Sequence, residues 1–342
     1  MLRAVRRRLP ARVTNLTLLV ALALAFATGA GAVATGSPRG RWIVLAHGAA
    51  GLLLVALAPA KTRIARSGLR RNGAGRYASL LLAGLTVAAL VAGVLHSTGL
   101  VRAVAGLPAL WFHIAFALAL VPLLVWHLVA RGVRGRRTDL SRRVLLRTGW
   151  LVGLAAALDA VVTLGTDAGL PGARRRFTGS YETASFDPAR LPPTIWLADA
   201  VPAVDPQRWR LQVVDAGGRR ELGLAELTAA AVRRRALLDC TSGWYSVQDW
   251  DGVPVGSLLG AREGARSLLV HAVTGYWVRF PVEDVDDLLL ATGVGGSALT
   301  PGHGYPARLV APGRRGYWWV KWVDQIELSP DPWWWQPPFP VT

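Results

Sequence analysis

The chain has 342 residues, a formal net charge of +18, 52% hydrophobic residues and a single cysteine. The positive charge is confined to residues 1–167, which hold 21 basic and 3 acidic residues, whereas residues 168–342 hold 18 of each. Because the basic half is also the apolar half, the excess charge is not the basic surface of a nucleic-acid-binding protein. We therefore exclude nucleic acid as a partner and expect two domains, residues 1–167 and 168–342.

Five apolar stretches in the first half are each long enough to cross a bilayer, which takes about 20 residues in a helix. These stretches are residues 14–35, 42–60, 77–98, 108–130 and 148–166. The sequence therefore predicts an all-α five-helix transmembrane bundle with membrane lipid around it. The small residues at 27–32 leave a cleaved signal peptide as the alternative interpretation of the first stretch.

The basic residues alternate between the connecting segments. Residues 1–13, 61–76 and 131–147 carry five, six and seven basic residues, whereas 36–41 carries two and 99–107 carries one. The positive-inside rule then places the N-terminus in the cytoplasm and everything after the fifth helix outside. We expect a multi-pass protein of the cell membrane with an extracytoplasmic C-terminal domain.

Histidines in the apolar half indicate a haem. His47 and His113 each lie about five residues from the outer end of their helix, and equal depth on two helices suits axial ligation of haem b iron. His96 is a substitute ligand for either. The spacing of His113 and His127 resembles that of membrane cytochromes b, but the inner level has no second histidine, so we expect one haem. In the fifth helix, Asp159 marks either a quinol site or a helix of marginal hydrophobicity.

From residue 168 the sequence changes to short β-type stretches separated by proline and glycine, which predicts an α+β, mostly β, globular domain. Cys240 has no second thiol to pair with. The run LLDCTSGWYSVQDWDGVPVGSLL, residues 237–259, resembles the molybdenum-ligand segment of the sulfite oxidase family. Residues 303–328, HGYPARLVAPGRRGYWWVKWVDQIEL, resemble that family's pterin-binding segment. The resemblance covers roughly residues 175–330 and implies a molybdopterin-binding oxidoreductase fold.

The resemblance assigns roles to individual residues. Cys240 would be the ligand of molybdenum, because a thiolate is a soft donor that suits such a metal. The basic positions Arg308 and Lys321 would hold the phosphate of molybdopterin. The resemblance implies further contacts with the cofactor at Thr241, Gly243, His303 and Gly304. It also implies that Trp244 and Tyr245 are aromatic residues that line the pocket. A structural cysteine, a solvated arginine and a capping histidine are the alternative interpretations.

The residues after the cysteine indicate the branch of the family. Sulfite-oxidising members continue with an Ala-Gly-Asn-Arg-Arg type run, whereas this chain has no arginine between Cys240 and Arg262. It is more similar to the periplasmic methionine-sulfoxide reductase branch. We expect quinol electrons to pass through haem to molybdenum and then to a small or protein-bound S-oxide or N-oxide. The alternatives are oxidation of sulfite or another sulfur compound, and a cofactor-free tethered binding module.

Two further segments carry signals of export and of membrane contact. The run SRRVLLR, residues 141–147, resembles the twin-arginine export signal, which serves proteins that cross the membrane folded; a topology anchor is the alternative. The tryptophan-rich run at 331–338 favours either a membrane interface or packing on its own domain.

Overall fold

The computed structural model describes residues 9–69, 74–132, 135–136, 139, 141–195 and 200–337. The chain divides into two compact units, one comprising Met1–Ala32 and Arg39–Gly179 and the other Val33–Pro38 and Ser180–Thr342. We call them the helical unit and the sheet unit. The helical unit extends beyond the predicted limit at residue 167, because a 3-10 helix at Pro171–Arg174 packs on its last long helix and on the third of the long helices.

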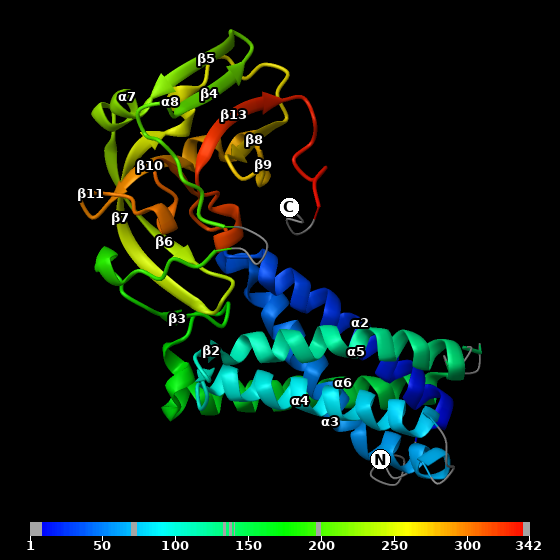
Figure 1. The fold of residues 1–342 in the computed structure, drawn as a ribbon. Coiled ribbons are helices and arrows are strands. Elements are labelled where there is room, and N and C mark those ends of the chain that lie inside the picture. The colour runs from blue at the N-terminus through cyan, green and yellow to red at the C-terminus, as the bar shows by residue number, and fades with distance from the viewer. Residues whose placement is uncertain are drawn as a thin grey trace. The chain divides into compact units, whose positions relative to one another are not determined.

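The described residues of the helical unit form five long helices (Figure 1). They are α2 (Ala11–Ala34), α3 (Arg41–Leu69), α4 (Ala74–Thr98), α5 (Ala109–Arg131) and α6 (Arg142–Gly169). Each is long and apolar enough to cross a membrane, and together they confirm the five predicted apolar helices. Several arginines on which the predicted orientation rests lie outside the described residues, namely Arg3, Arg6, Arg7, Arg8, Arg70, Arg71, Arg134 and Arg137.

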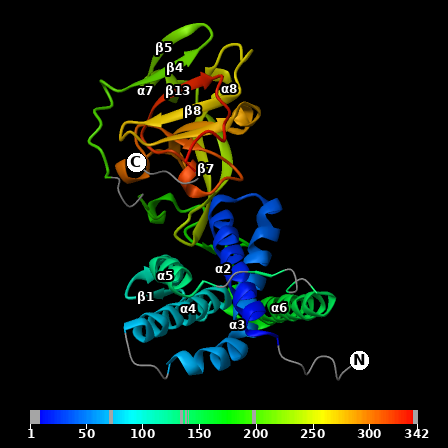
Figure 2. The same cartoon turned by 90° about the vertical axis from the view of Figure 1, so that its right-hand side faces the viewer.

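Helix α4 lies alongside α5, and α3 lies alongside α6 (Figure 2). A short hairpin of β1 (Ala103–Val104) and β2 (Leu107–Pro108) joins α4 to α5. The buried residues between the helices are few and mostly small or aliphatic: Ala21, Leu53, Leu54, Leu57 and Ala155 form one cluster. Many large apolar side chains of these helices are exposed instead.

The sheet unit contains two sheets (Figure 1). The six-stranded sheet consists of β3 (Tyr181–Glu182), β6 (Val232–Asp239), β7 (Trp244–Pro254), β10 (Leu289–Val294), β11 (Ser297–Ala298) and β12 (Arg308–Val310). The five-stranded sheet has the order β5 (Gly218–Gly223), β4 (Arg210–Asp215), β13 (Val323–Ser329), β8 (Ser267–Ala272) and β9 (Trp277–Pro281). The described residues of this unit also include two short α-helices, α7 (Leu224–Ala229) and α8 (Val255–Leu258), and several 3-10 turns, and the predicted sheet-rich character is confirmed.

The core of the sheet unit is one cluster of aliphatic and aromatic side chains. Every residue of β10 is buried, as expected for a strand with neighbours on both sides and cover on both faces. Trp250 of β7 is fully buried and packs against Trp319, with ring centroids 5.6 Å apart. This core fixes the long β6–β7 hairpin, whose connecting turn begins at Cys240.

The tryptophan-rich tail is anchored on the sheet unit. The side chain of Gln336 accepts a hydrogen bond from Arg279 N at 2.9 Å and donates one to Arg279 O at 2.8 Å, which fixes the tail to β9. Trp334 and Trp335 nevertheless remain 64% and 66% exposed. Of the predicted run 331–338, Pro338 lies outside the described residues.

Candidate functional site

Cys240 begins the tight turn that joins β6 to β7. Its backbone N–H donates to Trp244 O at 2.8 Å, and Gly243 N donates back to Cys240 O at 3.2 Å. Gly243 has φ +95°, a conformation that costs a residue with a Cβ atom, so glycine closes this turn without strain. The thiol therefore projects from a turn whose backbone is held by the hairpin itself.

A buried ion pair clamps the same turn. Arg315 Nη1 lies 3.3 Å from Asp239 Oδ1, with both side chains only 2% exposed, and Arg315 Nη2 donates to Cys240 O at 3.0 Å. Ser180 Oγ donates to Asp239 Oδ1 at 2.6 Å. A Cβ atom on Gly316 would lie 3.1 Å from Cys240 Cα, which is closer than most Cβ contacts, so glycine favours the close passage of the chain at this point. Cys240 is thus fixed from both the hairpin and the Arg315–Gly316 segment.

The thiol has a polar and cationic surrounding. Cys240 is 8% exposed, and its Sγ lies 3.0 Å from Ser242 Oγ. Arg308 is close enough for its charge to interact with the thiol. A hydroxyl and a guanidinium thus lie next to the sulfur, and a cysteine sulfur binds metals as the thiolate.

Arg308 is a buried cation whose charge the described protein does not balance with a carboxylate. It is 2% exposed and stacks over Trp250 at 5.1 Å, and its Nη1 and Nη2 donate to His303 O at 3.2 Å and Trp319 O at 3.4 Å. Its Nε has no partner among the described residues. Burial lowers the pKa of this guanidinium to about 10, so it stays charged at neutral pH. A buried charge of this kind requires a counter-charge, which an anionic cofactor would supply.

Lys321 and Gly304 lie together next to Arg308. The ammonium of Lys321 donates to Thr194 O at 2.8 Å and to Gly302 O at 2.5 Å. Gly304 has φ +103°, and a Cβ atom there would lie 3.2 Å from Lys321 Cα and 3.0 Å from Arg308 Cβ. The absent side chain of Gly304 therefore lets these two basic residues come together.

His303 uses both ring nitrogens within the protein. Its Nε2 donates to Leu191 O at 2.9 Å, so its Nδ1 is unprotonated and accepts from Thr300 Oγ1 at 2.7 Å. Burial, followed by the charges of Arg308 and Lys321, lowers the pKa of His303, so the ring is neutral at pH 7. The cofactor contact predicted for His303 would need one of these hydrogen bonds to break if the imidazole made it.

The predicted pocket residues surround the turn. Thr241, Trp244 and Tyr245 are half-buried, and the indole Nε1 of Trp244 donates to Thr194 Oγ1 at 3.1 Å. Thr194 thus contacts both Trp244 and Lys321, through its hydroxyl and its carbonyl respectively. The structure brings the residues predicted around Cys240 and those predicted for the pterin into one region of the sheet unit.

Sequence reasoning missed four residues of this region: Ser180, Asp239, Ser242 and Arg315. Asp239 and Ser242 are the first and last residues of DCTS, and Arg315 is the second arginine of PGRRG. All three lie inside the two quoted motifs, so the motifs could have identified them as site residues. Ser180 lies on a separate segment, and nothing in the sequence pairs it with Asp239.

The possible metal-binding side chains near Cys240 fit a metal that is already bound by a cofactor. Among the described residues, no three His, Cys, Asp or Glu side chains form a group that could hold a metal ion. One cysteine thiol alone cannot complete a metal site, but it can add a thiolate to a metal already held by a dithiolene cofactor. The lone Cys240 and the unbalanced charge of Arg308 both fit molybdopterin.

The helical unit holds a second candidate site at His47 of α3 and His113 of α5. Their ring centroids are 5.8 Å apart with an angle of 85° between the planes. Since a metal–imidazole bond measures about 2 Å, two rings on opposite sides of one metal ion have their centres about 6 Å apart. The two predicted haem ligands are therefore side by side at a spacing that suits one shared iron.

Hydrogen bonds orient both rings. His47 Nδ1 lies 2.9 Å from Ala25 O, and His113 Nδ1 lies 2.7 Å from Ala89 O. A carbonyl only accepts, so each Nδ1 carries the proton and each Nε2 keeps its lone pair for a metal. A ligand histidine whose other nitrogen donates to a carbonyl is the usual arrangement at metal sites.

The other histidines of the helical unit are placed differently. His96 is 6% exposed, and its Nε2 donates to Gly179 O at 2.9 Å, so it ties the end of α4 to the segment after α6. His127 lies near the other end of α5, with its ring centroid 6.4 Å from that of Trp126.

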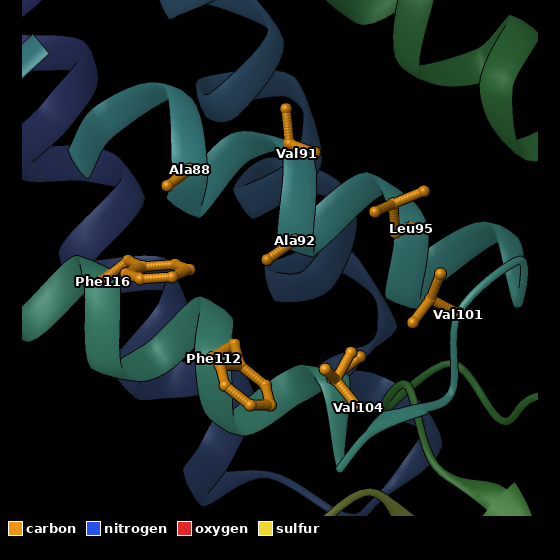
Figure 3. Close-up of a pocket in the computed structure, with 9 residues that line it drawn as sticks. Ala88, Val91, Ala92, Leu95, Val101, Val104, Phe112 and Phe116 are labelled. Atoms are coloured by element: carbon orange, nitrogen blue, oxygen red, sulfur yellow. The ribbon is translucent and has the colours of Figure 1, made fainter. Parts of the chain in front are cut away.

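An apolar pocket of about 280 Å³ lies between α4 and α5 (Figure 3). Figure 3 shows Ala88, Val91, Ala92 and Leu95 of α4 opposite Phe112 and Phe116 of α5. Its lining offers no polar side chain, so it suits hydrocarbon and lacks the groups that perform chemistry.

Comparison with known proteins agrees with the geometry of the sheet unit. Residues 198–334 match the family model described as oxidoreductase molybdopterin binding domain. The chain is 34% identical over 169 residues to sulfite oxidase of Gallus gallus, covering 38% of this chain and 37% of that protein. It is 30% identical over 147 residues to the uncharacterized oxidoreductase YuiH of Bacillus subtilis, covering 40% of this chain and 73% of that protein.

Two further known proteins are similar to parts of this chain. A nitrate reductase [NADPH] of Mycosarcoma maydis is 52% identical over 42 residues, covering 12% of this chain and 4% of that protein. The sulfane dehydrogenase SoxCD of Paracoccus pantotrophus is 26% identical at a TM-score of 0.35, covering 38% of this chain and 40% of that chain.

Fold, site and relatives together define a molybdenum-dependent oxidoreductase with a molybdopterin-binding domain of the sulfite oxidase and nitrate reductase type. The chain belongs to the oxidoreductase molybdopterin-binding domain family.

The buried Asp239–Arg315 pair yields a test of how the cysteine turn is held. Arg315→Met leaves Asp239 buried without its partner, which should destabilise the sheet unit by about 3–5 kcal/mol. Thermal unfolding of the detergent-solubilised full chain, followed by tryptophan fluorescence, should show a clearly lower midpoint. The double variant Asp239→Asn with Arg315→Met removes both charges and should recover much of the loss.

The matched control is Arg233→Met, because Arg233 pairs with Asp251 while 59% exposed. It should cost less than about 1 kcal/mol. An unchanged midpoint for Arg315→Met would contradict the role of the buried pair.

Proposed function

We propose that the protein is a membrane-anchored molybdopterin-dependent reductase that takes electrons from quinol through haem b and delivers them to a small or protein-bound S-oxide or N-oxide. The observation that carries the molybdenum part is Cys240, a buried thiol beside a cationic Arg308 that has no carboxylate partner among the described residues. Cys240 would bind molybdenum, while Arg308 and Lys321 would hold the anionic part of the cofactor. When bound, the cofactor supplies two-electron redox chemistry at the metal.

The pair His47–His113 supports haem b in the helical unit, which would make this unit a fused cytochrome b-type domain. Both rings present an unprotonated Nε2, and each is fixed by a hydrogen bond to the backbone of a neighbouring helix. Axial histidines are the haem ligands of many electron-transfer proteins. A haem held between two helices would link a membrane electron donor to the molybdenum centre.

Reduction of an S-oxide is favoured by the uncharged turn after the cysteine. Thr241, Ser242 and Gly243 carry no cation, and the half-buried Trp244 and Tyr245 offer aromatic surface. Such a lining suits a neutral S-oxide better than a small dianion, and it agrees with a place in the methionine-sulfoxide reductase branch. The second candidate is oxidation of sulfite, which the 34% identity to a protein named sulfite oxidase supports.

The membrane assignment rests on α2–α6, which are long and apolar enough to span a bilayer. With the basic segments inside, the helical unit would have a cytoplasmic N-terminus, and the sheet unit would be extracytoplasmic. Arg142 and Arg143 of SRRVLLR form the first residues of α6. We infer that this motif directs the folded, cofactor-loaded sheet unit across the membrane.

The experiment that tests the proposal is Cys240→Ser, which exchanges a soft sulfur donor for a hard hydroxyl of nearly the same size. The purified variant should fold and lose turnover with dimethyl sulfoxide, trimethylamine N-oxide and methionine sulfoxide when reduced viologen supplies the electrons. Metal analysis should show molybdenum in the wild type, and sulfite with ferricyanide tests the opposite direction. Full activity of the variant with molybdenum present would refute the ligand assignment, and a wild type without molybdenum would favour the binding module.

The haem assignment is tested by His47→Ala and His113→Ala. Each should abolish the b-type absorbance of the dithionite-reduced protein, because a six-coordinate haem needs both ligands. His96→Ala and His127→Ala are the matched controls and should keep the spectrum. A wild-type spectrum in both His47→Ala and His113→Ala would exclude this pair.

The export motif is tested by the double change Arg142→Lys and Arg143→Lys, which keeps both positive charges but removes the guanidinium groups. We expect the variant to retain a protease-protected sheet unit in the cytoplasm. Digestion of spheroplasts with an external protease measures this directly. Equal digestion of variant and wild type would mean that SRRVLLR is a topology anchor only.

A further inference from the structure

Asp159 is a carboxylate in the interior of the otherwise apolar helix α6. The helix ends ten residues later, at Gly169, which places Asp159 about 15 Å from that end along the axis. The other acidic residue of α6, Asp167, is exposed and lies in the last turn of the helix. Ionisable groups deep within a membrane helix are costly and usually serve a function.

The carboxylate lies on the face of α6 that packs within the bundle. Ala155 and Thr166 are 0% and 1% exposed and lie four residues before and seven residues after Asp159, which places all three on one helix face. Helix α3 packs along α6. Asp159 therefore points towards α3.

Its contact on α3 is Gly48, which follows the haem-ligand candidate His47. A Cβ atom on Gly48 would lie only 2.3 Å from Asp159 Oδ1, so the carboxylate lies against Gly48 of α3 and a side chain at this position would displace it. Since consecutive Cα atoms are about 3.8 Å apart, Asp159 Oδ1 lies within roughly 8 Å of His47 Cα. The carboxylate therefore lies close to the position on α3 that carries the proposed haem ligand His47.

The carboxylate is also available to a ligand. Among the described residues no hydrogen-bond donor or ion-pair partner lies within bonding distance of it, and only Arg175, beyond the end of α6, acts on it electrostatically. The side chain is half-buried, not enclosed. A molecule that reaches this group from the bilayer must be soluble in hydrocarbon and must donate a hydrogen bond, because a carboxylate only accepts.

We propose that Asp159 is the proton acceptor of a quinol-oxidation site on the α3–α6 face, beside Gly48 and His47. This inference rests on the proposed function, in which quinol supplies the electrons. A quinol combines the required properties, because it dissolves in the bilayer, has phenolic O–H donors and gives up electrons together with protons.

The reaction balances with groups already named. Oxidation of one quinol to quinone breaks two O–H bonds and releases two protons and two electrons. Each proton passes from a quinol oxygen to Asp159 and then to water beyond the end of α6. The two electrons would pass one at a time to a haem held by His47 and His113, and that haem would pass both on to the molybdenum centre.

The pocket between α4 and α5 is the competing place for a quinol (Figure 3). It lacks a polar side chain and offers no acceptor for a phenolic hydroxyl. This apolar pocket suits an acyl or prenyl chain, whereas the Asp159 carboxylate beside Gly48 suits the quinol ring, whose hydroxyl groups react.

The test compares Asp159→Asn with Asp167→Asn in the full-length, haem-loaded protein. Menadiol is the quinol, and stopped-flow absorbance follows haem reduction. Because proton transfer by a positioned side chain contributes about 10²–10⁴-fold, Asp159→Asn should slow haem reduction by at least about tenfold. Asp167→Asn should reduce haem at the wild-type rate. The dithionite-reduced b-type spectrum should be retained in both variants, which shows that the haem is still bound, and Asp167→Asn should also keep viologen-driven S-oxide reduction.

A second variant tests the geometry. Gly48→Ala places a methyl group where the carboxylate lies, so it should also slow reduction by menadiol while dithionite still gives the b-type spectrum. Wild-type rates in Asp159→Asn overturn the inference, as does equal slowing in both Asn variants or loss of the dithionite spectrum in Asp159→Asn. A wild type that menadiol cannot reduce overturns the quinol route itself, and viologen-driven turnover then shows separately whether the molybdenum reductase survives.

Discussion

The buried ion pair between Asp239 and Arg315 is the constraint on which the candidate site of the sheet unit depends. It joins the end of β6 to the Arg315–Gly316 segment, and the same guanidinium holds the carbonyl of Cys240. Two charges at 2% exposure lose their hydration, so the pair is stable only because each partner has further hydrogen bonds. The position of the thiol is therefore set by electrostatics between two segments that lie 75 residues apart in sequence.

A second constraint is the shortage of negative charge next to a buried cation. Arg308 is held by carbonyls and by the face of Trp250, but its charge has no carboxylate partner among the described residues. A protein that keeps such a group uncompensated carries an energetic cost that a bound anion removes. The same reasoning applies to the helical unit, where two histidines with unprotonated Nε2 atoms and one carboxylate on a glycine lie together in apolar surroundings. Both units thus hold polar groups whose partners the described residues do not provide, which is a usual property of sites that bind something.

Each unit also uses glycine to bring groups together that side chains would separate. Gly316 lets the chain pass next to Cys240, and Gly48 lets Asp159 reach the backbone of α3. In both places a Cβ atom would meet its neighbour at 3.1 Å or less. Close packing of this kind limits how far each of these groups can move towards its neighbour, because the approach is already at contact distance.

The sequence by itself determined the five apolar helices, the sheet-rich second half and the family. Helix length and hydropathy are local properties, and the motifs around Cys240 and at 303–328 are contiguous, so each can be read without a fold. It also placed His47 and His113 at equal depth, because helical rise converts residue number into distance along an axis. Only the tertiary structure decided that the centroids of these two rings lie 5.8 Å apart. It also decided that both ring nitrogens of His303 form hydrogen bonds, to Thr300 and Leu191. The same holds for the contacts of Ser180 and Arg315 with Asp239. These contacts join residues that are far apart in the chain. The packing of the whole unit determines which helices face each other and which strand lies beside which turn, and no local sequence pattern contains that information.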